Sequence, residues 1–178
     1  LTNDDDVNLA IAISAKLLAP RLPSLCRAES RDTAANMASF GTRHIINPFE
    51  KFSEYLALAL HSPSAWQLLI WLTSLPGATV ERHRDPPRDA WLLCGHGRFG
   101  RFIVEAMERE SIPITIIDRD TPEDFSHRWI QGDGTVAATL DAAGIRSASG
   151  IIGSTSSDIN NLSIAVTARE LNPDLFVI

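Results

Sequence analysis

The stretch AWLLCGHGRFG at residues 90–100 carries the strongest structural signal in this sequence. Its apolar beginning, Ala90–Cys94, predicts a buried β-strand, and the glycines that follow have the spacing Gly-x-Gly-x-x-Gly. Gly95 allows a tight turn, Gly97 has no Cβ to keep a phosphate away, and Gly100 allows the next helix to pack closely on the strand. The first-turn amides and the dipole of that helix favour an anion, so the stretch predicts a phosphate-binding loop.

The same glycines are also consistent with a strand-to-helix corner that binds nothing. The elements after the loop favour phosphate binding, because apolar strands alternate with helices. This alternation predicts an α/β fold, a Rossmann-like doubly wound parallel sheet covered by helices on both faces. The expected strands are Ala90–Cys94, Ile112–Asp118, Trp129–Gln131, Gly150–Gly153 and Leu175–Ile178, with helices at Arg98–Glu110, at Thr135–Ala143 and from Ser157 or Asp158 onward.

A carboxylate stands where the ribose of a nucleotide would need one. Asp118 ends the second expected strand, 23 residues after Gly95, and an acid at about this distance accepts hydrogen bonds from ribose hydroxyls. Because a carboxylate repels a 2′-phosphate, NAD or an adenine nucleotide is favoured over NADP. Asp120 is the alternative ribose partner, but Asp118 lies at the expected strand end.

A second polar turn follows the third expected strand. Gly132 and Gly134 flank Asp133, and Thr135 comes next. In a doubly wound sheet this turn lies at the carboxyl edge, beside the adenosine half of the crevice. Asp133 and Thr135 equally fit a role in capping the following helix, and the two roles are compatible.

An internal repeat links the two ends of the sequence. When residues 155–178 are set over residues 2–25, an offset of 153, ten of 24 positions are identical. Both copies predict a polar turn, a helix, a proline and a strand. The identical pairs are Thr2/Thr155, Asp5/Asp158, Asn8/Asn161, Leu9/Leu162, Ile11/Ile164, Ala12/Ala165, Ala15/Ala168, Leu18/Leu171, Pro20/Pro173 and Leu22/Leu175.

The repeat predicts that the chain contains parts of two similar domains. Residues 1–61 would be the C-terminal part of a first domain, with a helix at Arg31–Ser39, a strand at His44–Ile46 and a helix at Phe49–His61. Residues 62–89 would be an amphipathic segment followed by an exposed linker at Pro76–Arg88. Residues 90–178 would be the nearly complete N-terminal lobe of a second domain.

Two association surfaces follow from this division as hypotheses. Residues 1–61 could complete the open sheet edge after Ile178, within the chain or in a partner. The apolar stripe of the amphipathic segment either forms a second association surface or packs within the chain. Its members are Trp66, Leu69, Ile70 and Leu72.

Composition narrows the function classes. Sixteen basic and 22 acidic residues give a net charge of −6, and the absence of a basic stripe disfavours binding of nucleic acid. Cys26 and Cys94 do not form a disulfide framework, which favours the cytoplasm. We expect no signal peptide, and the longest apolar run, Ala65–Leu75, is too short to span a bilayer.

These motifs together resemble the RCK domain, the regulator-of-K⁺-conductance or Trk-type NAD-binding module. The resemblance rests on CGHGRFG, IIDRD, QGDGT, LDAAGI and STSSDINNLSIAVTARELNP, in that order, and covers Ala90–Ile178. Residues 1–61 resemble the later part of the same domain, so the chain resembles the junction of a tandem pair. The resemblance implies nucleotide-dependent regulation of a potassium channel or transporter, with no catalysis.

The resemblance also implies a set of cofactor-binding residues. The glycine loop would contact phosphates, Asp118 would hold the ribose, Asp133 and Thr135 would flank the adenosine, and Thr155 would approach the phosphates. His96 occupies a variable loop position where its charge could tune anion affinity, and Arg98 is equally consistent with a solvated residue. The full predicted set is Gly95, His96, Gly97, Arg98, Phe99, Gly100, Asp118, Arg119, Asp133, Gly134, Thr135 and Thr155, with no catalytic residue and no metal ligand.

The expected ligands are NAD or NADH, or alternatively ATP, ADP or AMP. The expected partners are further copies of the chain, in a dimer or larger ring, and a membrane pore or transporter subunit. The expected location is the cytoplasm, in association with an inner-membrane transport protein. An NAD-dependent oxidoreductase and a ligand-free assembly domain remain the alternatives, although no acid–base constellation for hydride transfer is visible.

Overall fold

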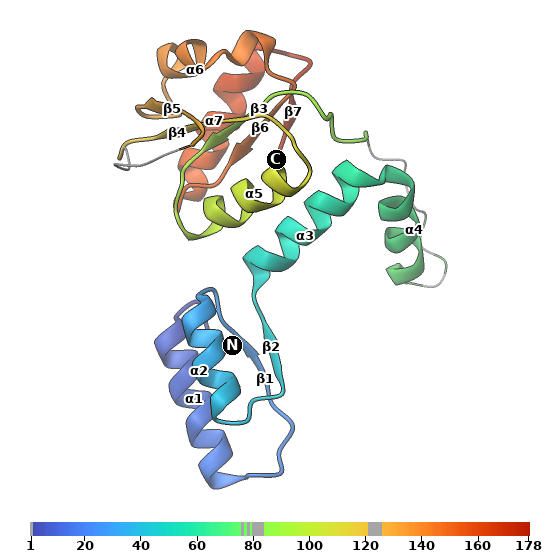
Figure 1. Cartoon of the computed structure of the whole chain (residues 1–178), viewed down its shortest axis with the longest axis vertical. Helices are drawn as coiled ribbons and strands as arrows, with labels where there is room; N and C mark the ends of the chain where they lie inside the picture. Colours follow the sequence, from blue (N-terminus) through green and yellow to red (C-terminus); the bar gives the residue numbers. More distant parts are fainter. Residues whose placement is uncertain (1, 76, 78, 80–83, 121–125) are drawn as a thin grey trace. The chain divides into compact units, whose positions relative to one another are not determined.

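The computed structural model describes residues 2–75, 77, 79, 84–120 and 126–178 and divides the chain into two compact units, Leu1–Phe52 and Ser53–Ile178 (Figure 1). We call them the first and second unit and describe each by itself. The helix α3, Pro48–His61, begins in the first unit and continues in the second.

The second unit is built on a five-stranded parallel sheet, which confirms the predicted α/β fold. Its strands lie in the order β5-β4-β3-β6-β7, and every neighbouring pair is parallel. The order is that of a doubly wound sheet, in which the chain starts in the middle, moves to one edge and then returns to build the other. The strands are β3 Trp91–Cys94, β4 Ile114–Asp118, β5 Arg128–Gln131, β6 Gly150–Gly153 and β7 Phe176–Val177.

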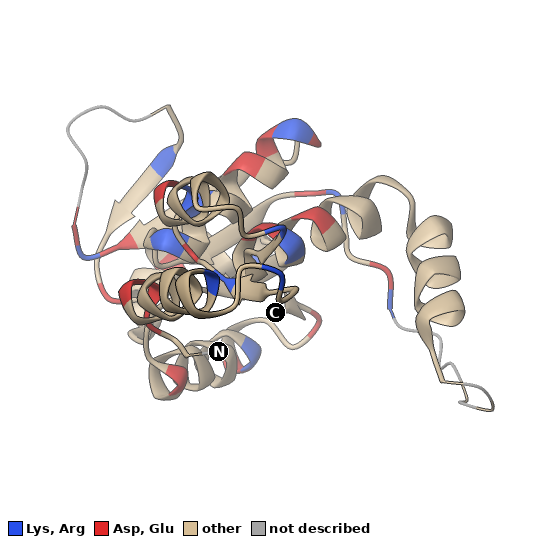
Figure 2. Ribbon diagram, turned by 90° about the horizontal axis from the view of Figure 1, so that it is seen from below, with Lys and Arg blue, Asp and Glu red and all other residues tan. Residues whose placement is uncertain are grey.

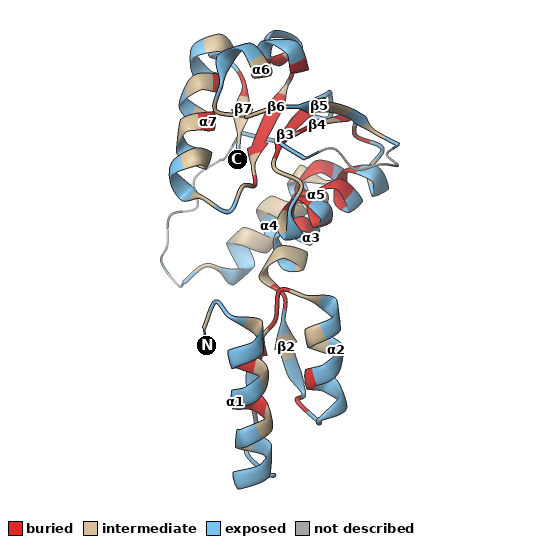
Figure 3. Ribbon diagram, turned by 90° about the vertical axis from the view of Figure 1, so that its left-hand side faces the viewer, coloured by how far each residue is buried: buried red, intermediate tan, exposed pale blue. Residues whose placement is uncertain are grey.

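Alternation along β3 divides the apolar core into two layers. Trp91 and Leu93 pack into the layer beneath α5, Arg98–Arg109, whereas Leu92 and Cys94 pack into the layer beneath α6 and α7. All four residues are at most 2% exposed, and Figure 3 shows β3 and β6 as buried strands. Burial of both faces of a central strand is what a parallel sheet requires.

The helices of the second unit differ from the predictions mainly at their ends. The helix predicted at Thr135–Ala143 begins two residues later, as α6 Ala137–Ala143, because Thr135 is held in a turn by Asp133. Gly144, at φ +93°, ends this helix and leads into a 3₁₀ turn. The remaining helices are α4 Pro63–Thr73 and α7 Asp158–Leu171, for which Ser157 is the N-cap.

The predicted linker, Pro76–Arg88, lies partly outside the described residues. Its last residue, Arg88, donates from Nη1 to the carbonyl oxygen of Leu60 at 2.6 Å and from Nη2 to that of Glu110 at 3.0 Å. One guanidinium therefore ties the chain entering β3 to the C-terminal ends of α3 and α5.

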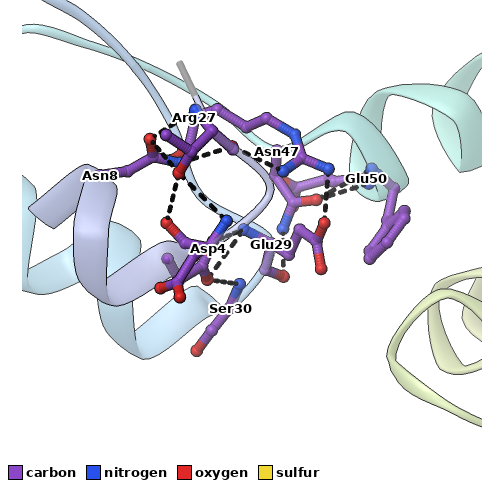
Figure 4. Close-up of polar contacts among 10 residues, drawn as sticks. Asp4, Asn8, Arg27, Glu29, Ser30, Asn47 and Glu50 are labelled. Carbon is purple, nitrogen blue, oxygen red and sulfur yellow. Dashed lines mark hydrogen bonds and ion pairs between the residues drawn. The ribbon is translucent and has the colours of Figure 1, made fainter.

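The first unit has two parallel strands with two helices packed against them. Its elements are α1 Asp5–Leu18, β1 Leu25–Arg27, α2 Arg31–Ser39 and β2 His44–Ile46, and β1 pairs only with β2 among the described strands. A small core of Ala12, Cys26, Ala28 and Met37 joins the helices to the strands. Figure 4 shows the polar contacts at the carboxyl ends of these strands, where Asn47 donates to the carbonyl oxygen of Glu29 at 2.9 Å.

The sequence repeat is also a repeat of hydrogen bonds. In the first unit the Asn8 carboxamide accepts from Thr2 N at 2.9 Å and donates to the Thr2 carbonyl oxygen at 2.9 Å. In the second unit Asn161 makes the same two bonds with Thr155, at 3.0 and 3.1 Å. In each copy the threonine hydroxyl also donates to the asparagine Oδ1, at 3.1 and 2.7 Å. We call this arrangement the Thr–Asn clamp.

Within the described residues, no helix combines the length and the apolar character needed to cross a bilayer.

Candidate functional site

The glycine loop lies at the carboxyl edge of the sheet, where its winding reverses. From β3 the chain runs through α5 to β4 and β5 on one side, and it later returns to β6 on the other side of β3. The loops after β3 and β6 therefore leave the sheet in opposite directions and open a crevice between them, the usual ligand position in such sheets.

Close backbone contacts explain two of the loop's glycines. Gly95 has φ +100°, and a Cβ on it would lie 3.0 Å from the backbone of Ser154 and Thr155. A Cβ on Gly100 would lie 2.3 Å from the Gly95 carbonyl oxygen, closer than atoms can approach. At Gly97, the N-cap of α5, a Cβ would meet no described atom within 4 Å, so this backbone faces open space.

Asp118 is connected to the glycine loop. Its Oδ2 accepts the backbone N–H of His96 at 2.5 Å, and its Oδ1 accepts that of Asp120 at 3.1 Å. Because a carboxylate offers about four lone-pair positions, both oxygens can still accept hydroxyl groups of a ligand. Asp118 thus fixes the glycine loop while facing the crevice. Asp120 contributes only its backbone N–H, which donates to the Asp118 carboxylate.

Asp133 forms the centre of a polar network beside the crevice. Its Oδ1 accepts from Thr135 N at 2.9 Å and from Thr135 Oγ1 at 2.7 Å, and its Oδ2 pairs with Arg119 Nη2 at 2.6 Å. The bonds from Thr135, then the one from Arg119, lower the pKa of Asp133 to about 2. The pKa of Arg119 is raised by the same hydrogen bond, so the pair is charged at neutral pH.

The loop after β6 forms the opposite wall. Ser154 is buried, and its hydroxyl lies 2.6 Å from the carbonyl oxygen of Gly95 and 3.1 Å from that of Cys94. Thr155 is held by Asn161 through the Thr–Asn clamp. Two loops distant in sequence are thereby fixed against each other across the switch point.

The crevice has a volume of about 280 Å³ and brings together eight of the predicted site residues. These are Gly95, Gly97, Asp118, Arg119, Asp133, Gly134, Thr135 and Thr155.

Four predicted residues do not line it. Gly100 serves close packing, and Phe99 packs against the core layer beneath α5. Arg98 is exposed in the first turn of α5. The His96 ring stacks edge-on against Trp129 with centroids 5.4 Å apart, and burial, followed by the charge of Arg101, lowers its pKa. A histidine that loses its proton more readily carries less charge toward an anion at neutral pH.

Sequence reasoning missed several lining residues. Ser156 lies in the loop before α7, Asn160 lies in its first turn, and Ile164 and Cys94 are apolar lining residues. The predicted end of the fourth strand at Gly153 was the available signal, because residues after that strand face the glycine loop in a doubly wound sheet. Burial, then the charge of Asp133, raises the pKa of the Cys94 thiol to about 12, so it contributes packing rather than reactivity.

Chemically, the crevice offers open backbone and a helix N-terminus at one end and two carboxylates at the other. This combination suits a ligand with an anionic part and a hydroxyl-bearing part. Among the described residues, no group of three or more His, Cys, Asp or Glu side chains is arranged to hold a metal ion.

The parallel sheet, its strand order and the glycine loop at the switch point define a Rossmann-like α/β domain. Residues 91–178 match the model of the TrkA-N domain. The match confirms the resemblance to RCK and Trk-type domains on which the expectations were based.

Potassium channels and transporters are among the relatives. Potassium channel protein 1 of Methanocaldococcus jannaschii is 35% identical over 95 residues, which is 49% of this chain and 28% of that protein. The glutathione-regulated potassium-efflux system protein KefC of an Enterobacter strain is 28% identical over 155 residues, which is 82% of this chain and 24% of that protein. The chain thus spans less than a third of the length of either relative.

Solved structures of GsuK share the fold. The GsuK channel bound to NAD matches with a TM-score of 0.71 and 19% identity, covering 98% of this chain and 43% of that one. GsuK bound to ADP matches with a TM-score of 0.69 and 22% identity, covering 98% and 40%. At these identities the likeness establishes the fold.

Proposed function

We propose that the second unit is a regulatory module that binds an adenine nucleotide, NAD(H) or alternatively ATP, ADP or AMP, and controls a potassium channel or transporter. The observation that carries the proposal is the single crevice in which the open backbone at Gly97, the N-terminus of α5 and the carboxylate of Asp118 meet.

The phosphates would lie over Gly97. The space above its Cα is open, and the first amides of α5 point toward it, so an anion is favoured without any basic side chain. This explains how a chain with a net charge of −6 can bind a polyanionic nucleotide. His96 and Arg98 are not needed for this part of the site.

The adenosine would lie between the ends of β4 and β5. Asp118 would accept the ribose hydroxyls, and the Arg119–Asp133 pair with Thr135 would form the wall beside the base. A 2′-phosphate would meet the Asp118 carboxylate, so NADP is expected to bind more weakly than NAD.

The proposed partners follow from the relatives. Because those proteins are named as potassium channels and transport systems, the module would act in a homo-oligomeric assembly with a membrane pore, on its cytoplasmic side, and without catalysis. Residues 1–61 would belong to a first domain of the same type, and 62–89 would join it to the module at 90–178. The eight predicted site residues that line the crevice would contact the nucleotide, and Phe99 and Gly100 would hold the glycine loop in place.

Calorimetric titration of the chain with NAD, NADH, NADP, ATP, ADP and AMP tests the proposal. We expect saturable binding of at least one adenine nucleotide and a loss of about tenfold to a hundredfold in Asp118→Ala, because a charged hydrogen-bond acceptor is removed. Asp120→Ala is the matched control, and its affinity should stay close to that of the unchanged chain. Absence of binding to all six ligands would reject the proposal in favour of an assembly role.

A hydride-transfer assay separates regulation from catalysis. NADH absorbance should stay constant in the presence of the chain and a panel of 2-oxo acids and aldehydes. Substrate-dependent oxidation of NADH that disappears in Asp118→Ala would instead identify an oxidoreductase.

A further inference from the structure

A second concave site lies in the first unit, at the amino-terminal ends of β1 and β2. Its volume is about 320 Å³, and its lining includes Lys16, Arg21, Arg43 and His44 but no acidic residue. This is unusual for a chain with 22 acidic and 16 basic residues. We call it the basic cavity. Figure 2, which views the chain from below, shows the Lys and Arg positions along the ribbon.

The helix C-termini that border the basic cavity explain only one of its cations. Positive charges are common beside helix C-termini because they pair with the last carbonyl groups. Lys16 does this, since its Nζ donates to the Pro20 carbonyl oxygen at 3.1 Å. The equivalent residue of the second copy, Arg169, makes the same bond to Pro173 at 2.9 Å. The role of Lys16 in the turn is therefore structural.

The end of α2 needs no cation from the cavity. Backbone amides already bond to its last carbonyl oxygens: Phe40 N to Asn36 at 3.3 Å, Gly41 N to Ala38 at 2.9 Å and Thr42 N to Met37 at 3.1 Å. Arg43 follows directly after this ending and lines the cavity instead.

Two of the cavity's cations, Arg21 and Arg43, carry exposed side chains. In the part of the chain that the structure describes, neither guanidinium makes a hydrogen bond or an ion pair. The repeat also shows that the turn does not require Arg21, because the equivalent position of the second copy is Asp174. The same helix, proline and strand therefore form with the opposite charge at this position.

We propose that the basic cavity binds a small phosphate-bearing anion, of the size of pyrophosphate or the triphosphate of a nucleotide. A guanidinium presents its N–H groups in a planar fork that matches two phosphate oxygens, and two such forks beside an ammonium group in one cavity suit a diphosphate better than a single carboxylate. This site is distinct from the crevice of the second unit, and the inference does not depend on the proposed function.

Gly41 keeps the wall of the cavity open. It has φ +86°, and a Cβ at this position would lie 3.4 Å from Cε and Nζ of Lys16. A larger residue would therefore press on the ammonium group that faces the anion.

Titration of the ¹⁵N-labelled chain with sodium pyrophosphate tests the proposal residue by residue. The amides of Ser24, Gly41 and Arg43 report on the basic cavity, and that of Gly97 reports on the glycine loop. We expect saturable shifts at the first three amides, with an affinity that falls at least fivefold in Arg21→Asp, the residue of the second copy, and in Arg43→Ala. The shift at Gly97 should be the same in the variants as in the unchanged chain.

Three outcomes would overturn the inference. These are shifts at the cavity amides that rise linearly without saturation, affinity that survives the double variant Arg21→Asp/Arg43→Ala, and citrate binding as tight as pyrophosphate binding. The last would show a general anion surface rather than a phosphate site. Failure of nucleotide binding at Gly97 alone would leave this inference intact and count against the proposed function only.

Discussion

The two copies of the repeat, α1 with β1 and α7 with β7, have the same local bonds and different surroundings. Both hold the Thr–Asn clamp, and in both a basic side chain in the last turn donates to the carbonyl oxygen of the following proline. Yet Ile164 is 1% exposed, whereas the identical residue of the first copy, Ile11, is 52% exposed.

The difference lies in the face that each helix buries. In α7 the buried residues are Ile164 and Ala168, which pack on the sheet and α6, whereas in α1 they are Asn8 and Ala12, which lie toward α2 and β1. Twenty-four residues therefore specify the turn, the helix and its bonds, and the neighbouring elements specify which side becomes core.

The largest expected difference in stability between the two copies is at the isoleucine that they share, Ile11 in the first and Ile164 in the second. Ile164→Ala should destabilise the second unit by about 2–4 kcal/mol because it removes buried methyl groups and leaves a cavity. Ile11→Ala should change the first unit by no more than about 0.5 kcal/mol. Urea unfolding measures both: all four tryptophans lie in the second unit, so fluorescence reports on it, and far-UV circular dichroism reports on the whole chain. Equal losses would show that the two environments are not different.

The clamp should matter for ligand binding in one copy only. Asn161→Ala removes the bonds that hold Thr155, which should cost about 1–3 kcal/mol and weaken nucleotide binding about tenfold. Asn8→Ala should have a similar stability cost in its own unit and leave nucleotide affinity unchanged. Calorimetric titration of both variants with the same nucleotide makes the comparison. A loss of affinity in Asn8→Ala would contradict the assignment of the site to the second unit.

The N-caps of α1 and α7 should contribute nearly equally to stability. Asp4 accepts the amides of Asp6 and Val7, and Ser157 accepts that of Asn160. Replacing either by Ala should therefore cost about 1 kcal/mol. Asp4→Ala should cost slightly more in low salt, because it also removes a negative charge from a helix N-terminus. Thermal unfolding at two salt concentrations measures this, and identical salt dependence of the two variants would disprove it.

The smallest expected effect is a loss of stability at acid pH through protonation of Asp133. Asp133, whose pKa is lowered to about 2 in the folded chain, contributes stability that is present above its unfolded value near 3.8 and is lost as the pH falls through about 2. The urea midpoint of Asp133→Asn should thus approach that of the unchanged chain between about pH 4 and 2. Asp141→Asn, at an exposed ion pair with Arg146, is the control. If the urea midpoints of the unchanged chain and of Asp133→Asn fell equally between about pH 4 and 2, Asp133 would not be the cause of the acid destabilisation.

Much of the second unit could be predicted from short-range pattern. The strands and the glycine loop follow from apolar runs and glycine spacing, which depend on neighbouring residues. The Arg119–Asp133 pair could not be predicted in this way. Its two residues are 14 positions apart in the sequence and follow two different strands, which only the folded sheet brings side by side. The helix α6 begins after Thr135 because Asp133 accepts the Thr135 amide in a turn. The N-cap of α6 is Val136, so the predicted capping by Asp133 and Thr135 is wrong.

Some residues line the crevice only because the fold brings distant parts of the chain together. Ser156 and Asn160 line the crevice because the loop after β6 crosses in front of Gly95, a contact between residues about 60 positions apart. His96 and Arg98 lie within the glycine motif. Their backbone is in the loop, but the His96 ring turns toward Trp129, and Arg98 is exposed.

The contacts of Arg88 affect how the chain would behave after proteolytic cleavage between α4 and β3. Because its guanidinium bonds to carbonyl oxygens at the ends of both α3 and α5, and because Leu56 and Leu60 of α3 are part of the core beneath α5, α3 is attached to the sheet domain by more than the peptide chain. A protease that severs the connection between α4 and Arg88 would therefore leave two fragments that stay together through gel filtration and separate only when the core unfolds.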